Sequence, residues 1–109
     1  MRDLNLTEEM VLWAVWRLKD DAYGVTIRDH LIRKTGRKYP YGTLYSALAK
    51  LEKVGYAKKT VADPSPVRGG RSKNLYRITP SGIAALKAAA ELKTTIWDKE
   101  SVLALEETR

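Results

Sequence analysis

Basic side chains gather in the middle of this 109-residue sequence, in a pattern suited to binding phosphate groups. Residues 28–77 hold three acidic residues (Asp29, Glu52, Asp63) against thirteen basic ones: Arg28, Arg33, Lys34, Arg37, Lys38, Lys50, Lys53, Lys58, Lys59, Arg68, Arg71, Lys73 and Arg77. The flanking segments are nearly neutral, although the whole chain carries a formal charge of +7. Lys and Arg release condensed counterions when they contact a polyanion. The pattern therefore predicts a polyanionic partner, with a solvated basic face as the alternative.

Catalytic and metal-binding chemistry finds few suitable residues in the chain. His30 is the single histidine, and there is no cysteine. Zinc sites and nucleophile–base pairs draw mainly on these two residue types. The pair Gly69-Gly70 lacks the spacing of a glycine-rich phosphate loop. We therefore expect a protein that is not an enzyme and needs no metal or cofactor, with His30 at the surface or boundary of a helix.

The composition, 44% hydrophobic and 30% charged, is typical of one small folded domain. No stretch reaches the roughly 18 apolar residues of a membrane span, and the first ten residues do not resemble a signal peptide. The absence of cysteine fits a reducing compartment. The expectation is a soluble cytoplasmic protein.

Three helices are predicted in the first half of the chain, where they would position the basic residues. Thr7 is expected to cap the first, which is apolar almost all round over residues 10–16 and ends at Asp20-Asp21. The second covers about residues 25–34, and Gly36 is placed to end it. The third covers about residues 41–54, with a buried stripe of Leu44, Leu48 and Leu51. Two such helices joined by a short link form a helix-turn-helix.

Two β-prone runs, residues 56–62 and 74–79, follow the third helix and enclose a loop rich in Pro, Gly and Arg. Tyr76 and Ile78 would share one face of the second strand, as its period of two requires. A hairpin directly after a helix-turn-helix predicts a winged helix; an ordinary exposed hairpin is the alternative. We expect a mostly helical α+β fold, with residues 1–79 as a winged helix-turn-helix domain that binds a polyanion.

A long final helix is predicted for residues 80–109. Thr79 would cap it and Pro80 would open it. Good helix formers continue to about Trp97, with an extension to Leu105 left open. Two apolar stripes run along this helix, which would be longer than one face of a domain of this size. Such a helix usually packs against a partner helix. We expect a homodimer in which this dimerisation helix packs on the first helix of the other chain, and a monomeric C-terminal cap is the alternative.

Three segments resemble the PadR-like transcriptional regulators: Tyr23-Gly24, GTLYSALAKLEKVGY (residues 42–56) and GGRSKNLYRITPSG (residues 69–82). The resemblance covers about residues 6–97 and is closest to small members with a single C-terminal helix. It implies a winged helix-turn-helix homodimer that binds double-stranded operator DNA, usually as a repressor and often under control of a small molecule. In some small members the dimer interface forms a pocket for flat aromatic compounds.

Residue roles follow from the way in which a recognition helix enters the major groove with its N-terminus first. Tyr41, Thr43 and Ser46 are expected to face base edges, and Lys50 and Lys53 to contact the DNA backbone. Tyr45, part of the family segment, is expected to reach a phosphate or pack at the core edge. The wing residues Arg68, Arg71 and Lys73 would reach the minor groove or its phosphates. A dimer would read an inverted repeat.

The three tryptophans and the choice of partner leave alternatives open. Trp13, Trp16 and Trp97 lie on the two helices expected at the dimer interface, where they would either pack as core residues or line an effector pocket. A winged helix can also serve as a protein-interaction or RNA-binding module. Small polar groups, Tyr and Lys on the third helix favour nucleic acid over protein. The deep, narrow major groove of RNA excludes a helix and favours duplex DNA.

Overall fold

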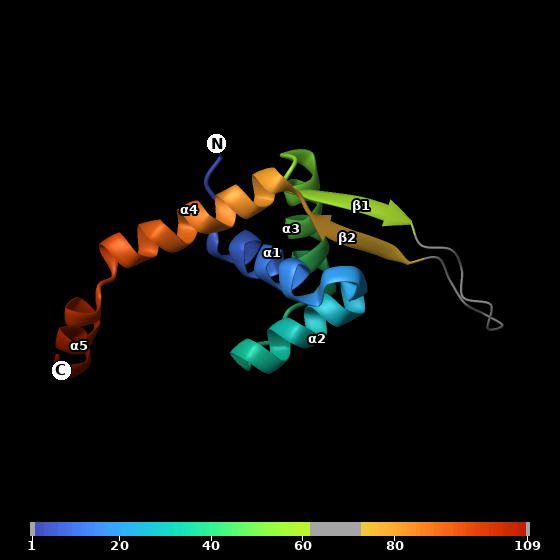
Figure 1. Ribbon diagram of the computed structural model, residues 1–109. Helices are drawn as coiled ribbons and strands as arrows, with labels where there is room; N and C mark the ends of the chain where they lie inside the picture. The colour runs from blue at the N-terminus through green and yellow to red at the C-terminus, as the bar shows by residue number, and fades with distance from the viewer. Residues whose placement is uncertain (1, 62–72, 109) are drawn as a thin grey trace.

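The computed structural model describes residues 2–61 and 73–108 of the chain. The elements are α1 (Leu6–Leu18), a short 3₁₀ helix η1 (Lys19–Asp21), α2 (Gly24–Thr35), α3 (Tyr41–Lys53), β1 (Ala57–Val61), β2 (Asn74–Ile78), α4 (Pro80–Ile96) and α5 (Lys99–Glu107), as Figure 1 shows. This is the predicted winged helix-turn-helix of mostly helical α+β class. Among the described residues, none of the helices combines the length and apolar character that crossing a membrane requires.

The start of α1 is fixed by a capping box whose N-cap lies two residues before the predicted cap. Asn5, and not Thr7, is the N-cap: its side chain accepts a hydrogen bond from the Glu8 amide at 2.8 Å, while the Glu8 carboxylate accepts one from the Asn5 amide at 3.0 Å. This arrangement satisfies two amides that a helix start leaves free. The prediction of Thr7 as cap was therefore wrong.

Glu8 is the only buried charged residue among those that the structure describes. The Arg2 guanidinium donates to its carboxylate at 2.8 and 3.1 Å, and this pairing holds the pKa of the Glu8 carboxyl below its ordinary value of 4.5. The Tyr56 hydroxyl donates to the Arg2 carbonyl at 2.5 Å. The N-terminal segment is thereby tied to both α1 and the end of α3.

Replacing Glu8 with glutamine is expected to lower the free energy of unfolding at pH 7 by about 1–2 kcal/mol, because hydrogen bonds to a charged acceptor are lost. A carboxyl whose pKa is lowered by folding stabilises the protein above its unfolded pKa, and this contribution disappears as the pH falls through the folded value. The deficit should therefore shrink below about pH 4.5 in urea unfolding at several pH values. Glu106→Gln, on exposed α5, is the control, and a deficit independent of pH would contradict the assignment.

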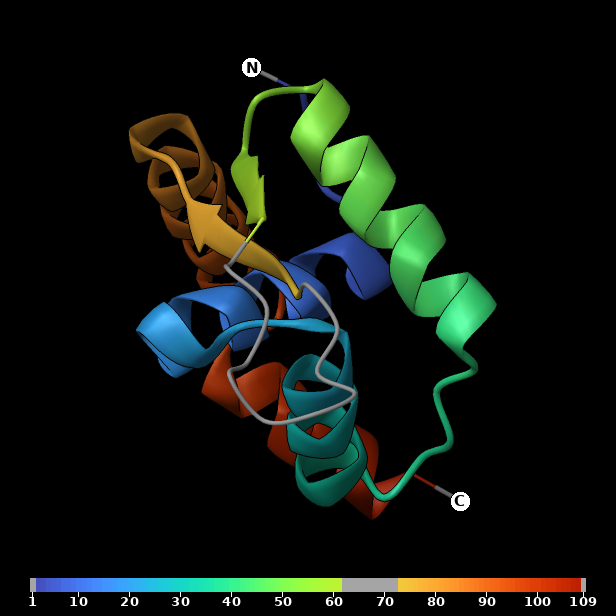
Figure 2. The same ribbon diagram turned by 90° about the vertical axis from the view of Figure 1, so that its right-hand side faces the viewer.

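The core lies where α1 passes between α3 and α4, as the second view makes clear (Figure 2). The predicted stripe Leu44, Leu48 and Leu51 is fully buried, which confirms the inward face of α3. Gly36 ends α2 with a φ of +70°, as predicted. Apolar burial of this kind supplies most of the driving force for folding a small domain.

The wing pairs β1 with β2 in antiparallel register, Lys59 opposite Tyr76 and Ala57 opposite Ile78. Tyr76 is buried and Ile78 half-buried, whereas Arg77 between them is exposed, which confirms the predicted alternation. The Tyr76 amide also donates to the Ala22 carbonyl at 2.8 Å. This bond joins the wing to the start of α2 and fixes its direction.

The C-terminal region forms two helices rather than one extended helix. Thr79 caps α4, accepting from the Gly82 amide at 3.0 Å, and Pro80 opens it, both as predicted. The extension to Leu105 does not occur: α4 ends at Ile96, and the Asp98 side chain accepts from the Ser101 amide at 2.7 Å to start α5. Figure 1 shows α4 leaving the domain and α5 turning away from it.

Candidate nucleic-acid interface

The exposed surface of α3 has two edges, and the helical repeat divides the predicted contact residues between them. Tyr41 and Tyr45, four residues apart, stack with ring centroids 6.0 Å apart on the edge that faces α2. Thr43 and Lys50 lie on the edge that faces the start of α1. Ser46 and Lys53 lie between the two edges. All six side chains are exposed, so α3 offers them to a partner.

The tyrosine edge is held by contacts that the sequence did not indicate. The Arg28 guanidinium lies 4.7 Å from the centroid of the Tyr41 ring and donates to the Tyr39 carbonyl at 2.6 Å. A cation over an aromatic face stabilises both groups. Tyr45 lies against the start of α2, where a Cβ added to Gly24 would come within 2.1 Å of the Tyr45 hydroxyl oxygen. Gly24 thus makes room for Tyr45.

The opposite edge of α3 borders a polar hollow of about 400 Å³ between α3 and the start of α1. Its lining is dominated by hydroxyl, amide and charged side chains, from Asn5, Thr7, Glu8, Gly42, Thr43, Ser46, Ala47 and Lys50. Thr7 was not predicted to line a site, because its place directly before Glu8 and Glu9 favoured a helix cap. Within residues 2–61 and 73–108, Lys50 and Lys53 form no ion pair, so their charge remains available.

The wing brings further basic side chains beside α2. The Lys73 ammonium lies 4.3 Å from the centroid of the Tyr23 ring, which holds it next to the start of α2. Arg77 is instead paired with Asp20 at 2.7 Å. The predicted contacts Arg68 and Arg71, together with Gly69-Gly70, lie outside the described residues.

His30 is half-buried on α2, at the boundary position predicted for it. Burial, and then the positive charges of Arg17, Lys34 and Arg33, lower the pKa of its imidazole. The ring is therefore biased toward its neutral form by a positively charged surrounding. In the described part of the chain, no group of three or more acidic or histidine side chains is arranged to hold a metal ion.

The three tryptophans fall into two separate grooves of a single chain. Trp13 and Trp16 meet edge to face, with centroids 5.7 Å apart, and line an apolar groove of about 190 Å³ with Ile83, Leu86, Lys87 and Ala90 of α4. Trp97 instead lines a groove of about 370 Å³ on another side of α4. Of the three tryptophans predicted to line an effector pocket, the structure brings Trp13 and Trp16 together and places Trp97 in a different groove.

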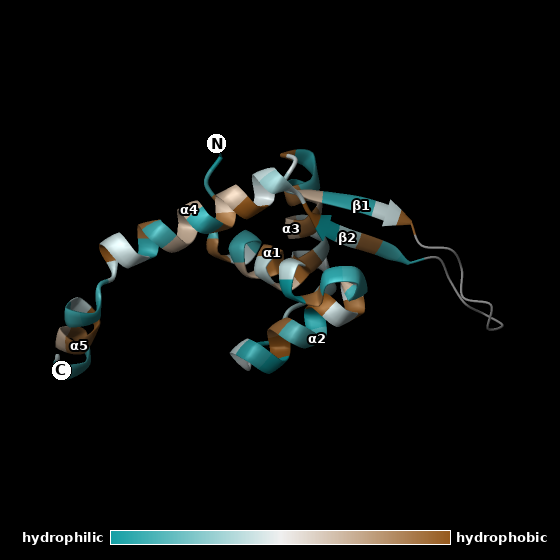
Figure 3. Cartoon of the chain, in the orientation of Figure 1, coloured by the Kyte–Doolittle hydropathy of each residue, from teal (hydrophilic) through white to brown (hydrophobic). Residues whose placement is uncertain are grey.

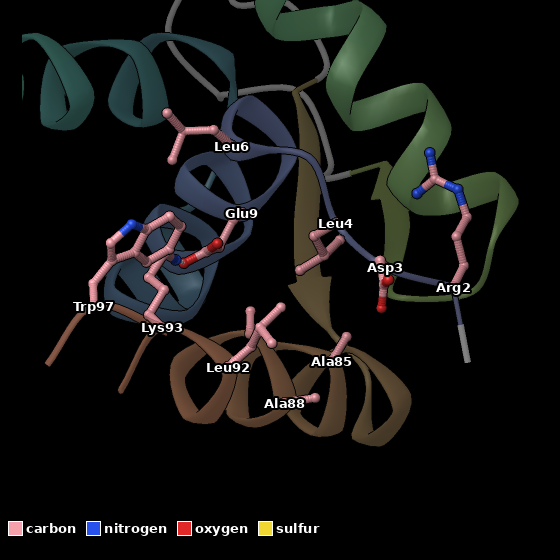
Figure 4. A pocket seen from close by; sticks show the side chains of 11 residues that line it. Arg2, Asp3, Leu4, Leu6, Glu9, Ala85, Ala88, Leu92, Lys93 and Trp97 are labelled. Atoms are coloured by element: carbon pink, nitrogen blue, oxygen red, sulfur yellow. Dashed lines mark hydrogen bonds and ion pairs between the residues drawn. The ribbon is translucent and has the colours of Figure 1, made fainter. Parts of the chain in front are cut away.

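The groove at Trp97 is formed by the N-terminal segment, α1 and α4 (Figure 4). Small side chains of α4 form its floor, and Glu9 of α1 pairs with Lys93 of α4 at one end, beside Trp97. This ion pair joins α4 to α1. Trp97 and Leu92 remain 62% and 57% exposed, so the groove is open to a partner.

Comparison with solved structures supports the fold. A transcriptional regulator from Clostridium thermocellum shares 28% identity with a TM-score of 0.66, covering 94% of this chain and 90% of that one. A PadR family transcription regulator from Clostridium difficile R20291 shares 20% identity with a TM-score of 0.73, covering 95% and 100%. Bacillus subtilis PadR, solved in complex with operator DNA, shares 18% identity with a TM-score of 0.65, covering 79% and 47%.

No curated protein matches the sequence. The sequence does match a family model, that of the transcriptional regulator PadR-like family, over residues 14–88. That range begins within α1, includes the whole helix-turn-helix and wing, and ends within α4. The three sequence segments that resemble the family all fall within it. The chain therefore belongs to the PadR-like family of transcriptional regulators, which are not enzymes.

Proposed function

We propose that the protein binds an operator in double-stranded DNA as a homodimer and represses transcription from it. The observation that carries the proposal is the exposed face of α3, where hydroxyl groups and two unpaired lysines of the described chain lie beside a basic wing strand. Hydroxyl and amino groups are the usual donors to phosphates and base edges. The complex of the Bacillus subtilis relative with operator DNA supports the same choice of partner.

In this proposal residues 1–79 form the DNA-binding domain. Tyr41, Thr43 and Ser46 read base edges in the major groove, while Lys50, Lys53 and Tyr45 bind backbone phosphates. Lys73 acts with Arg68 and Arg71 of the wing on the flanking minor groove or its phosphates. Positively charged side chains on both sides of the groove would fix the depth and register of α3.

Residues 80–109 form the dimerisation segment in this proposal. Apolar residues recur along α4 and α5 (Figure 3). Several of them are large and exposed: Leu92, Ile96, Trp97, Val102, Leu103 and Leu105. Isolated exposed apolar residues are common, but a contiguous set usually marks an interface. Two copies related by a dyad would present their α3 helices to half-sites about one helical turn, ~34 Å, apart.

Substitutions on α3 should distinguish contacts to backbone phosphates, which position the protein, from contacts to bases, which determine sequence preference. Lys50→Ala is expected to weaken binding to every duplex several-fold and to reduce the slope of log K against log salt by about one. Ser46→Ala should instead relax the base preference at one position of each half-site, by less than the ~1–3 kcal/mol of a bidentate contact. Fluorescence anisotropy at several salt concentrations measures both effects, with Lys99→Ala on α5 as the control. An unchanged affinity and salt slope in Lys50→Ala would contradict its role.

The apolar groove of Trp13 and Trp16 favours a further part of the proposal, an aromatic effector bound near the dimer interface. Trp97, which lines the other groove, would contact this effector from the same chain or from the second copy. Such a ligand would act by favouring a dimer geometry in which the two α3 helices no longer match successive grooves. Planar aromatic dyes are expected to quench tryptophan fluorescence and weaken operator binding. Trp16→Leu should reduce the quenching, and a varied dye panel without any quenching would contradict the pocket.

A further inference from the structure

Gly42, the second residue of α3, has no role in the fold that requires glycine. It is exposed, and a Cβ added there would meet nothing within 4 Å. Its φ does not lie in the left-handed region. The other four described glycines differ: Gly36 and Gly55 have positive φ, while Gly24 and Gly82 lie against neighbouring atoms.

Glycine at this place carries a cost that the folded chain does not recover. A helical glycine is less favourable than alanine, since its backbone loses more conformational freedom on folding. At Gly24 and Gly82 that cost is offset by close packing, whereas at Gly42 nothing in the described chain offsets it. A group that approaches α3 from outside would explain the glycine.

Gly42 lines the hollow between α3 and the start of α1 described above. Thr7 faces this space from α1, and Thr43, Ser46 and Lys50 from α3. Two threonine hydroxyls and the Lys50 ammonium group form a donor set suited to a phosphate oxygen. The Glu8 carboxylate also lines the hollow, and its charge is paired with the Arg2 guanidinium at 2.8 Å. Because Gly42 lines the hollow, a side chain at this position would occupy part of its opening on the exposed face of α3.

We propose that Gly42 is a positioning residue for DNA: its missing side chain lets a backbone phosphate of the duplex enter the hollow, where Lys50 and the hydroxyls of Thr7 and Thr43 bind it. The inference rests on the proposed function and identifies a backbone phosphate as the group of the duplex that binds in the hollow. It adds Thr7, on a different helix, to the contacts expected of α3.

The test combines DNA affinity with stability in Gly42→Ala. The matched control is Ser81→Thr, which also adds one methyl group to the exposed second residue of a helix. Ser81 lies at the start of α4, beside the C-terminal end of α3, whereas Gly42 lies at the N-terminal end. Gly42→Ala should leave Tm unchanged or raise it by about 3 °C. It should raise the Kd for an operator obtained by selection from random duplexes about tenfold, with a salt slope shallower by about one. Ser81→Thr should change neither property.

Each alternative result has one meaning. If Gly42→Ala binds the operator within twofold of the wild type, the inference is overturned while the proposed function stands. If Gly42→Ala lowers Tm by several degrees, the fold explains the glycine and the inference is again overturned. If the wild-type protein binds no duplex, both the inference and the proposed function fail.

Discussion

Replacing Ile96 with glutamate is expected to convert the proposed dimer to monomers and to weaken operator binding by about a hundredfold or more. Ile96 ends α4 and is 56% exposed, and in the described chain it lines neither the groove at Trp97 nor the groove of Trp13 and Trp16. Burying a carboxylate in an apolar interface carries a large desolvation penalty. Separate monomers also lose the high effective concentration with which a second half-site is bound.

Sedimentation velocity gives the oligomeric state, and operator titration gives the affinity. Because the described chain leaves Ile96 largely uncovered, the monomer fold should survive with an unchanged circular dichroism spectrum. Thr94→Glu is the control, since Thr94 is also exposed and lies on the opposite side of α4, two residues away. A stable dimer of Ile96→Glu with wild-type affinity would rule out the C-terminal segment as the dimerisation element.

Replacing Gly82 with alanine is expected to cost about 3 kcal/mol of the ~5–15 kcal/mol that stabilises a small domain. An added Cβ would lie 2.2 Å from the carbonyl oxygen of Tyr56 and 2.8 Å from Cγ1 of Ile78. The closer contact cannot be relieved by rotating a side chain, because the Tyr56 carbonyl oxygen belongs to the backbone. Helix α4 would have to move away from the end of α3.

The same junction contains the hydrogen bonds that fix the start of α4. The Tyr56 carbonyl accepts from the Thr79 amide at 3.0 Å, and the Thr79 hydroxyl donates to the Gly55 carbonyl at 2.6 Å. Displacing α4 would strain both bonds. Thermal unfolding should show Tm lowered by about 10 °C or more for a domain of this size. A Tm within 2 °C of the wild type would show that the junction accommodates a methyl group.

Local signals in the sequence predicted the buried face of α3 and the start of α4 correctly. The stripe Leu44, Leu48 and Leu51 defined the inward face of α3, and Thr79-Pro80 defined the start of α4. At α1 two residues could serve as caps. The correct one, Asn5, is the one with a glutamate three residues later, which is the spacing of a capping box. The sequence therefore contained the signal that would have excluded Thr7.

Features that depend on tertiary contacts could not be predicted. The break after Ile96 is not among them, since Thr94, Thr95 and Ile96 are poorer helix formers than the alanines before them. Asp98 is also a favoured N-cap residue, and its side chain accepts from the Ser101 amide. The stacking of Arg28 on Tyr41 depends on how α2 packs against α3, and the hollow that includes Thr7 depends on how α1 crosses α3. Helical periodicity predicts on which face of a helix a residue lies. It does not predict which residue of a second helix will contact it.

Selection from a pool of DNA duplexes with random cores, at about 0.15 M salt, tests sequence-specific operator binding most directly. The proposed function predicts enrichment of an inverted repeat whose half-sites are centred about one helical turn, ~34 Å, apart. Loss of that enrichment in a Thr43→Ala, Ser46→Ala protein that still binds DNA would connect the sequence preference to α3. Retention of duplexes without any enriched motif, or no retention at all, would contradict the proposal of a sequence-specific regulator.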